Sequence, residues 1–201
     1  MIWAGIMHEL EQLSPQEIER RSQNIGPGEW AVERQRPIST LLGSCVAVCM
    51  FDSVAGVGGM NHFMLPNMRR EGRHAEVDML LSGDYAMEAL LNALLNQGAA
   101  RHRIQAKAFG GGTIISGMAA SGIGPRNVDF AREWLERESI PLLASDFLGP
   151  WSRKVLLIPA AGIAWCKRMK TTLATAQEIA LEEERYAQSL LRPAKSNVEL
   201  F

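Results

Sequence analysis

The sequence predicts an α/β protein: a layered α/β sandwich of mostly antiparallel or mixed strands with two inner helices. Several short runs rich in Val, Ile and Leu are bounded by turn residues, a pattern typical of strands. Two segments in the middle of the chain instead repeat apolar residues at helical spacing. Strands combined with two core-facing helices favour sheets packed in layers with helices.

Composition limits the class of protein. The chain has 201 residues, of which 47% are hydrophobic and 21% charged, which is typical of a globular protein. Its formal net charge of -1 gives no basic surface for nucleic acid. No apolar run approaches the roughly 18 residues of a spanning helix, so membrane insertion is not expected. Three cysteines without a secretory signal favour a reduced, cytoplasmic protein.

The chain divides into three predicted parts. Residues 1–25 form a peripheral extension, in which a capping box from Ser14 to Glu17 begins a short helix. Residues 26–169 form the main domain. Residues 170–201 form an amphipathic helix and a tail. The thin apolar stripe and the run of three acids in this helix predict a solvated or partner-facing element that the chemistry does not require.

The first half of the main domain predicts strands. A short strand covers residues 29–34, and one long buried strand covers residues 38–52. A turn at 53–56 leads into a returning strand that Pro66 ends, so the two strands should pair as a hairpin. A polar loop is expected to follow, over residues 67–76.

The second half mixes helices and strands. Ser82 is expected to cap a helix running to about Gln97, and Asn127 a second helix. Between them, residues 104–112 read as a strand entering a glycine loop, with close backbone approach near an active site as its expected role. Residues 140–169 supply two or three further strands.

The cysteines do not suggest a metal site. On one continuous strand, Cys45 and Cys49 share a face but lie roughly 13 Å apart. That separation suits neither two zinc–thiolate bonds of about 2.3 Å nor a disulfide. Cys49 and Cys166 are therefore expected to be buried apolar residues, and no metal or other cofactor is expected.

Cys45 differs because Gly43 and Ser44 precede it. These small residues can leave backbone N–H groups facing the sulfur, which would form an oxyanion hole for acyl transfer. His62 follows 17 residues later, and a hairpin could return it beside the thiol as a base. From the residues alone, a nucleophilic pair and a plain core pair both remain open, and Asn61 is best explained as polar filler.

Five stretches, in order and over residues 28–169, resemble the chemoreceptor glutamine deamidase family, CheD: "STLLGSCVAVCMFD", "GVGGMNHFMLP", "KAFGGG", "IGPRN" and "RKVLLIPAAG". The resemblance implies that Cys45 is the nucleophile and His62 its base. It places a hydroxyl residue six positions before the cysteine, here Ser39 where threonine is usual, with Thr40 beside it as the other candidate to orient the histidine.

The resemblance also implies a fold and an activity. The fold would resemble bacterial deamidating toxins, and the reaction would convert glutamine side chains of methyl-accepting chemotaxis receptors to glutamate without a cofactor. The family suggests an alternative as well: a regulatory module that docks on a CheC-type chemotaxis phosphatase. A cysteine protease would use the same pair of residues but would release new peptide termini rather than ammonia.

Overall fold

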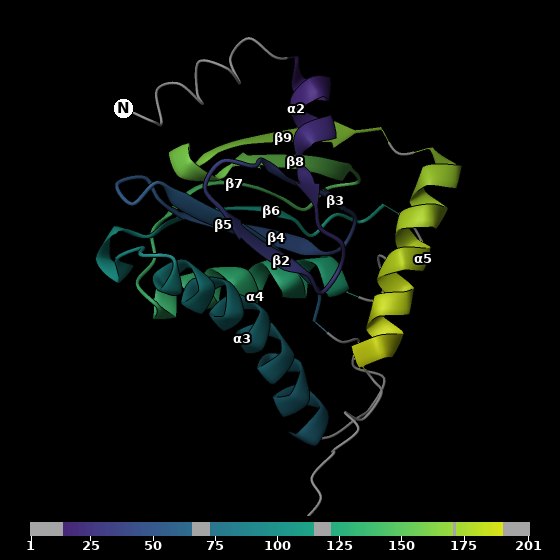
Figure 1. Cartoon of the computed structure of the whole chain (residues 1–201). Helices are drawn as coiled ribbons and strands as arrows, with labels where there is room; N and C mark the ends of the chain where they lie inside the picture. Colours follow the sequence, from purple (N-terminus) through teal and green to yellow (C-terminus); the bar gives the residue numbers. More distant parts are fainter. Residues whose placement is uncertain (1–13, 66–72, 115–121, 171, 191–201) are drawn as a thin grey trace, which may run out of the picture.

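The computed structural model describes residues 14–65, 73–114, 122–170 and 172–190. Two sheets make up the body of the molecule (Figure 1). The four-stranded sheet has the order β1-β3-β8-β9, with β1 Gln23–Asn24, β3 Ile38–Leu42, β8 Ser152–Ile158 and β9 Ile163–Met169. The five-stranded sheet has the order β2-β5-β4-β6-β7, with β2 Trp30–Glu33, β5 Val57–Phe63, β4 Val46–Asp52, β6 Gln105–Gly110 and β7 Leu142–Phe147.

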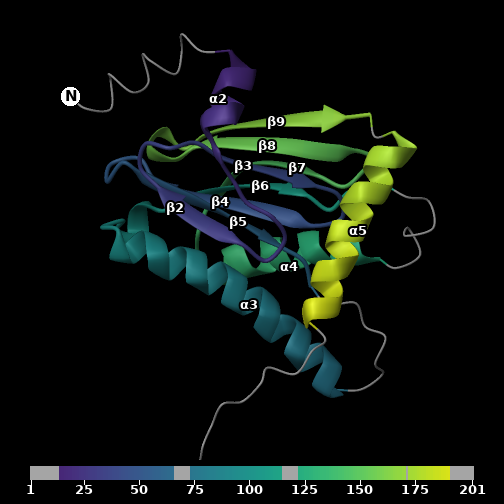
Figure 2. The same cartoon turned by 45° about the vertical axis from the view of Figure 1, so that its right-hand side comes forward.

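The described residues form four α-helices around the sheets: α2 Pro15–Arg21, α3 Arg73–Asn96, α4 Ile123–Arg137 and α5 Leu173–Leu190. Helices α3 and α4 cover one face of the five-stranded sheet (Figure 2). Short 3-10 helices, η1 Arg101–Arg103 and η3 Pro159–Ala161, lead into β6 and β9. Pairing is antiparallel except between β1 and β3 and between β6 and β7, so the predicted layered sandwich of mostly antiparallel strands is confirmed.

Alternation along the strands creates two apolar layers. One face of β4 sends Val46, Val48 and Met50 toward α3 and α4. The other face sends Ala47 and Cys49 toward the four-stranded sheet, and Cys45, just before the strand, is buried in the same layer. Because strand side chains alternate between faces, every second residue from Cys45 onward enters the layer between the sheets.

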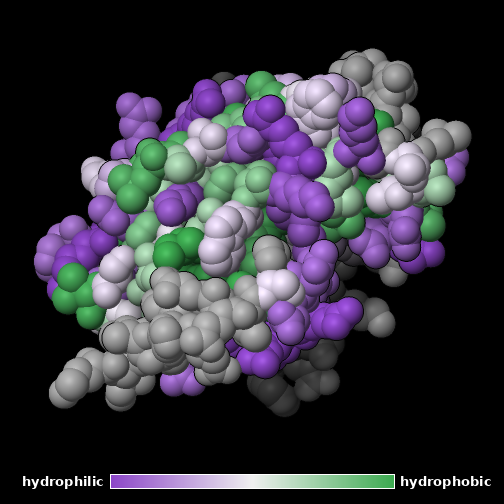
Figure 3. Space-filling model, turned by 90° about the horizontal axis from the view of Figure 1, so that it is seen from above, coloured by the Kyte–Doolittle hydropathy of each residue, from purple (hydrophilic) through white to green (hydrophobic). Residues whose placement is uncertain are grey.

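The N-terminal helix packs on the outer face of the four-stranded sheet. Its capping box forms as predicted, since the Ser14 hydroxyl accepts from the Glu17 N–H and the Glu17 carboxylate accepts from the Ser14 N–H. Ile18 is buried in a small cluster with Leu156 and Ile158 of β8. Seen from above, hydrophilic and hydrophobic side chains alternate over this face (Figure 3).

Three predicted boundaries were wrong. The expected single strand over 38–52 is two strands in different sheets, interrupted at residues 43–45. Helix α3 begins at Arg73, so Ser82 lies inside it and the predicted polar loop is partly helical. Helix α4 begins at Ile123, so Asn127 is buried inside the helix and is not its cap. Among the described helices, none is long and apolar enough to cross a membrane.

Candidate active site

The candidate site is the three-residue break between β3 and β4. The chain leaves the four-stranded sheet at Leu42, passes through Gly43, Ser44 and Cys45, and enters the five-stranded sheet at Val46. A segment that joins two packed sheets cannot continue either ladder. Its backbone groups therefore need other partners.

The backbone carbonyls of Gly43, Ser44 and Cys45 all accept hydrogen bonds from other segments of the protein. The Gly112 N–H donates to the Gly43 carbonyl and the Gly111 N–H to the Cys45 carbonyl, both at 2.8 Å. The glycine loop approaches so closely that a Cβ on Gly110 would lie 2.2 Å from the Cys45 carbonyl oxygen. This is the close backbone approach expected for the "FGGG" stretch.

Asn127 holds the third carbonyl. Its Nδ2 donates to the Ser44 carbonyl at 2.9 Å, and its Oδ1 accepts from the Leu65 N–H at 2.8 Å. The side chain is fully buried, so both bonds are shielded from water. The loop is thus fixed between the glycine loop and helix α4. The Gly43 and Cys45 N–H groups bond to a different part of the protein.

Those N–H groups converge on one point. The Gly43 and Cys45 N–H groups both donate to Oε1 of Glu183, at 3.1 Å each. The Ser44 hydroxyl donates to the other oxygen, Oε2, at 2.5 Å. Two backbone donors that share one anionic oxygen beside a cysteine have the arrangement of an oxyanion hole.

Glu183 belongs to α5, which crosses the ends of the strands on one side of the sandwich (Figure 1). Its side chain is buried, with 2% exposure, as is that of Ile179 one turn earlier. The helix predicted to be solvated or partner-facing therefore covers the candidate site. Residues 22–25, which the sequence placed in a peripheral extension, are also part of the packed structure around the site. Strand β1 pairs with β3, and Ile25 is buried between the sheets.

Cys45 and His62 lie on the same side of the five-stranded sheet. His62 pairs directly with Ala47, and Cys45 lies two residues before Ala47. Such diagonal neighbours have Cα atoms roughly 7–8 Å apart, within reach of a thiol and an imidazole. The predicted hairpin is confirmed, and it places the two residues on one face of the sheet.

The environment keeps Cys45 protonated in this conformation. Its side chain is fully buried. Burial raises the pKa of the Cys45 thiol well above its ordinary value, and the negative charge and the hydrogen bond of Glu183 raise it further. A thiol with a raised pKa is a poor nucleophile, because the thiolate is the reactive form.

The hydrogen bonds of Thr40 fix the tautomer of His62. The Thr40 hydroxyl donates to the Ile25 carbonyl at 2.7 Å and lies 2.8 Å from Nδ1 of His62. Since a hydroxyl has a single proton to donate, Nδ1 must carry the proton of the imidazole. Within the described part of the chain Nε2 has no hydrogen-bond partner, so it is the unprotonated nitrogen available as a base.

Burial also lowers the pKa of His62 to about 3, although a hydrogen bond to the Ile25 backbone opposes the shift. A neutral imidazole with a bare Nε2 is the form that can remove a proton from a thiol. The hydroxyl beside Nδ1 of His62 therefore belongs to Thr40, whereas the family resemblance pointed first to Ser39.

Ser39 faces the other way. Its hydroxyl accepts from the Ser22 hydroxyl at 2.7 Å and donates to Oδ1 of Asn24 at 3.3 Å. Because neighbouring residues of a strand point to opposite faces, Ser39 and Thr40 cannot both reach the layer that holds His62. The expectation that Ser39 orients the histidine is corrected to Thr40.

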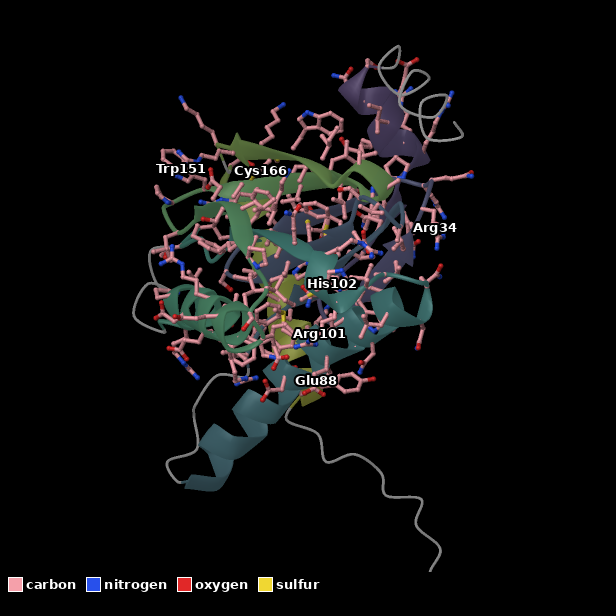
Figure 4. The ribbon with its side chains drawn as sticks, turned by 90° about the vertical axis from the view of Figure 1, so that its left-hand side faces the viewer. Arg34, Glu88, Arg101, His102, Trp151 and Cys166 are labelled. Carbon is pink, nitrogen blue, oxygen red and sulfur yellow. The ribbon has the colours of Figure 1, made fainter. Side chains whose placement is uncertain are left out.

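The other two cysteines lie apart from this arrangement. Cys49 is buried in β4, and burial raises its pKa to about 12. Cys166 is partly buried in β9, on the four-stranded sheet, and burial raises its pKa to about 11 (Figure 4). The nearby Asn61 faces α3, where it accepts from the Val48 N–H and donates to the Ala86 carbonyl.

Comparison with known proteins identifies the family of the chain. A family model described as "CheD chemotactic sensory transduction" matches residues 64–168, about half of the chain. "Probable chemoreceptor glutamine deamidase CheD 2" of Dechloromonas aromatica is 62% identical over 194 residues, which cover 94% of this chain and 98% of that protein. "Probable chemoreceptor glutamine deamidase CheD" of Cupriavidus metallidurans is 40% identical over 92% of this chain and 86% of that protein.

Among solved structures, the Bacillus licheniformis hypothetical protein YfiH matches with a TM-score of 0.36 and 10% identity. It covers 59% of this chain and 49% of that one, a likeness too weak to bear on function. The curated relatives match nearly the whole length of the chain at well above 30% identity. This chain therefore belongs to the CheD family of chemoreceptor glutamine deamidases.

Proposed function

We propose that this protein hydrolyses glutamine side-chain amides to glutamate on methyl-accepting chemotaxis receptors, with Cys45 as nucleophile. The observation that carries the proposal is the convergence of the Gly43 and Cys45 N–H groups on one oxygen beside the Cys45 thiol. The names of the curated relatives support the choice of substrate. Chemotaxis receptors expose their signalling region to the cytoplasm, so the proposal includes a cytoplasmic location.

The first half of the reaction forms a thioester. Nε2 of His62 takes the proton of the Cys45 thiol, and the sulfur attacks the amide carbon of the substrate glutamine. The amide oxygen becomes an oxyanion in the position where Oε1 of Glu183 lies, and it accepts from the Gly43 and Cys45 N–H groups. The carbon–nitrogen bond then breaks, and the His62 imidazolium gives its proton to the departing ammonia.

The second half restores the enzyme. His62, neutral again, removes a proton from water as the water attacks the thioester carbon. The carbon–sulfur bond breaks, the substrate leaves as glutamate, and the sulfur recovers its proton. Thr40 acts as a positioning residue throughout, because it holds Nδ1 and so keeps Nε2 directed toward the reaction.

Mass spectrometry of a receptor cytoplasmic fragment tests the proposal. Incubation with the protein should add about one mass unit at specific glutamines and release one ammonia for each, and Cys45→Ala should abolish both. Intact receptor mass also separates deamidation from proteolysis. If Cys45→Ala converts the receptor as fast as the unchanged protein, the proposal fails.

Docking on a CheC-type phosphatase is a second role, and it comes from the family resemblance alone. The same variant separates the roles: a binding module would keep its partner after Cys45→Ala, whereas the hydrolase activity would be lost. The two roles are compatible on one chain, so this comparison measures binding and ammonia release side by side.

A further inference from the structure

The oxyanion hole of this protein is already occupied by a side chain of the protein itself. Glu183 presents to it a carboxylate, which is the group that hydrolysis of a glutamine at the same position would leave. The carboxylate accepts from the two backbone donors of the proposed oxyanion hole, the Gly43 N–H and the Cys45 N–H.

The rest of α5 fits the surface on one continuous stripe. Ala176, Ile179 and Glu183 are buried, while Tyr186 and Ala187 pack against the layer between the sheets. Their spacings from Glu183 are -7, -4, +3 and +4, which is one face of an α-helix. Helix α5 therefore packs against the protein along this face, and Glu183 in the middle of the face enters the oxyanion hole.

Two glycines, Gly43 and Gly28, make space for the side chains of α5 because they have no Cβ. A Cβ on Gly43 would lie 2.8 Å from both Oε1 of Glu183 and a methyl carbon of Ile179. A Cβ on Gly28 would lie 2.2 Å from the Tyr186 ring. Tyr186 also borders a hollow of about 350 Å³ with Trp30, Tyr85 and Leu190, so the docked helix lies beside a concave surface.

We propose that α5 is a built-in product mimic: Glu183 occupies the subsite that receives the side chain of a glutamine carried on a substrate helix. Its docking keeps the site closed until a substrate helix displaces it. This rests on the proposed hydrolase function and extends it. The substrate segment is helical, and it carries apolar or small residues at about -7, -4, +3 and +4 from the reacting glutamine.

The sharpest test turns the mimic into a substrate. In Glu183→Gln, an amide oxygen replaces Oε1 with nearly the same shape, so the helix should dock as before. The thiol would attack the amide carbon, ammonia would leave, and water would release glutamate at position 183. Peptide mass spectrometry of the full chain should find position 183 converted, with a gain of about one mass unit.

The chain supplies its own controls. Gln177 and Gln188 lie on the same helix but are exposed, and they should remain glutamine. Combining Glu183→Gln with Cys45→Ala should leave Gln at position 183. The conversion should proceed at a rate independent of protein concentration, because the reaction is intramolecular.

A second pair of variants tests closure without changing Glu183. Ile179→Glu places a charge in the buried stripe and should release α5, whereas Leu181→Glu puts the same charge on the same helix at a side chain that is 49% exposed. If α5 is undocked in about one molecule in ten, full release raises deamidation of a receptor fragment about tenfold at low substrate concentration. Leu181→Glu should behave as the unchanged protein.

The outcomes separate this inference from the function on which it rests. If the protein deamidates a receptor fragment but position 183 stays glutamine in the Glu183→Gln variant, the product-mimic inference is wrong and the proposed function stands. If position 183 converts but the receptor fragment does not, the inference stands and the choice of receptor fails. Equal receptor activity in Ile179→Glu and Leu181→Glu would overturn the closure.

Discussion

Asn127 and Asn61 form a matched pair for measuring what the Gly43–Cys45 loop contributes to catalysis. Each is a buried asparagine that accepts from one backbone N–H and donates to one backbone carbonyl. Asn127 holds the Ser44 carbonyl, whereas Asn61 joins β4 and β5 to α3 on the side away from the thiol. Alanine at Asn127 removes the partner of two backbone groups, the Ser44 carbonyl and the Leu65 N–H. Alanine at Asn61 removes the partner of the buried Val48 N–H, whereas the Ala86 carbonyl keeps its hydrogen bond within helix α3.

The stability cost should be larger for Asn127→Ala. Each buried group that loses its partner costs about 1–3 kcal/mol, so Asn127→Ala should lose about 2–6 kcal/mol and Asn61→Ala about 1–3 kcal/mol. The loss in kcat should also differ between the two variants. Loss of a whole oxyanion donor reduces kcat by about 10²–10³-fold, and a loosened loop should approach the lower end of that range in Asn127→Ala. Asn61→Ala should keep kcat within about threefold.

Urea unfolding gives the stabilities, and ammonia release from a receptor fragment at saturating substrate gives kcat. Asn127→Asp is an informative third variant, because its carboxylate still accepts from the Leu65 N–H but cannot donate to the Ser44 carbonyl. It should show the rate loss together with a stability loss at least as large as that of alanine, because a buried carboxylate oxygen would face the Ser44 carbonyl oxygen. An equal fall in kcat for Asn127→Ala and Asn61→Ala would refute the view that Asn127 positions the loop.

Three further predictions follow from the contacts. Thr40→Val should lower kcat about 10- to 100-fold in the receptor assay because it frees the imidazole, whereas Ser39→Ala should stay close to the unchanged protein. Burial alone would raise the pKa of Asp52, but hydrogen bonds from Arg103 and the backbone outweigh it and hold that pKa well below the usual range. Asp52 therefore stabilises the fold above about pH 4 and loses this effect as the pH falls, so Asp52→Asn should flatten the acid side of a pH-dependent urea titration. In native protein, iodoacetamide should label the partly exposed Cys166 before the buried Cys45, and in Ile179→Glu this order should reverse, as peptide mapping would show.

The sequence was informative where local pattern decides the structure. The strands around Cys45 and His62 carry β-branched residues and a short turn, so their pairing was predictable, and with it the placement of Cys45 and His62 on one face of the sheet. The break at residues 43–45 was not, because apolar residues continue on both sides of it, and Gly43 and Ser44 alone do not mark a change of sheet. The hydroxyl that contacts His62 belongs to Thr40 and not to Ser39. Strand alternation decides which of the two faces the histidine, and the break at residues 43–45 shifts that alternation relative to Cys45.

Glu183 and Asn127 were missed for a different reason. Glu183 sits in a run of three acids, where a solvated face is the ordinary explanation, and its partners lie 138 to 140 residues earlier in the chain. Asn127 stands near the start of a helix and so resembles a cap. In both cases most of the partners are backbone groups far away in the chain, which have no signature in the sequence.

The position of α5 links access to the site with the reactivity of the nucleophile. With the helix docked, burial and the Glu183 charge keep the proton on the Cys45 thiol, and burial keeps His62 neutral. Displacement of Glu183 removes a negative charge and admits water, and both changes lower the pKa of Cys45. A thiolate beside His62 would in turn favour the imidazolium, since each charged form stabilises the other. The movement that uncovers the two N–H donors thus also prepares the nucleophile. Because the thiolate is also the form that oxidises, the proposed closure by α5 would also protect Cys45 until a substrate helix takes its place.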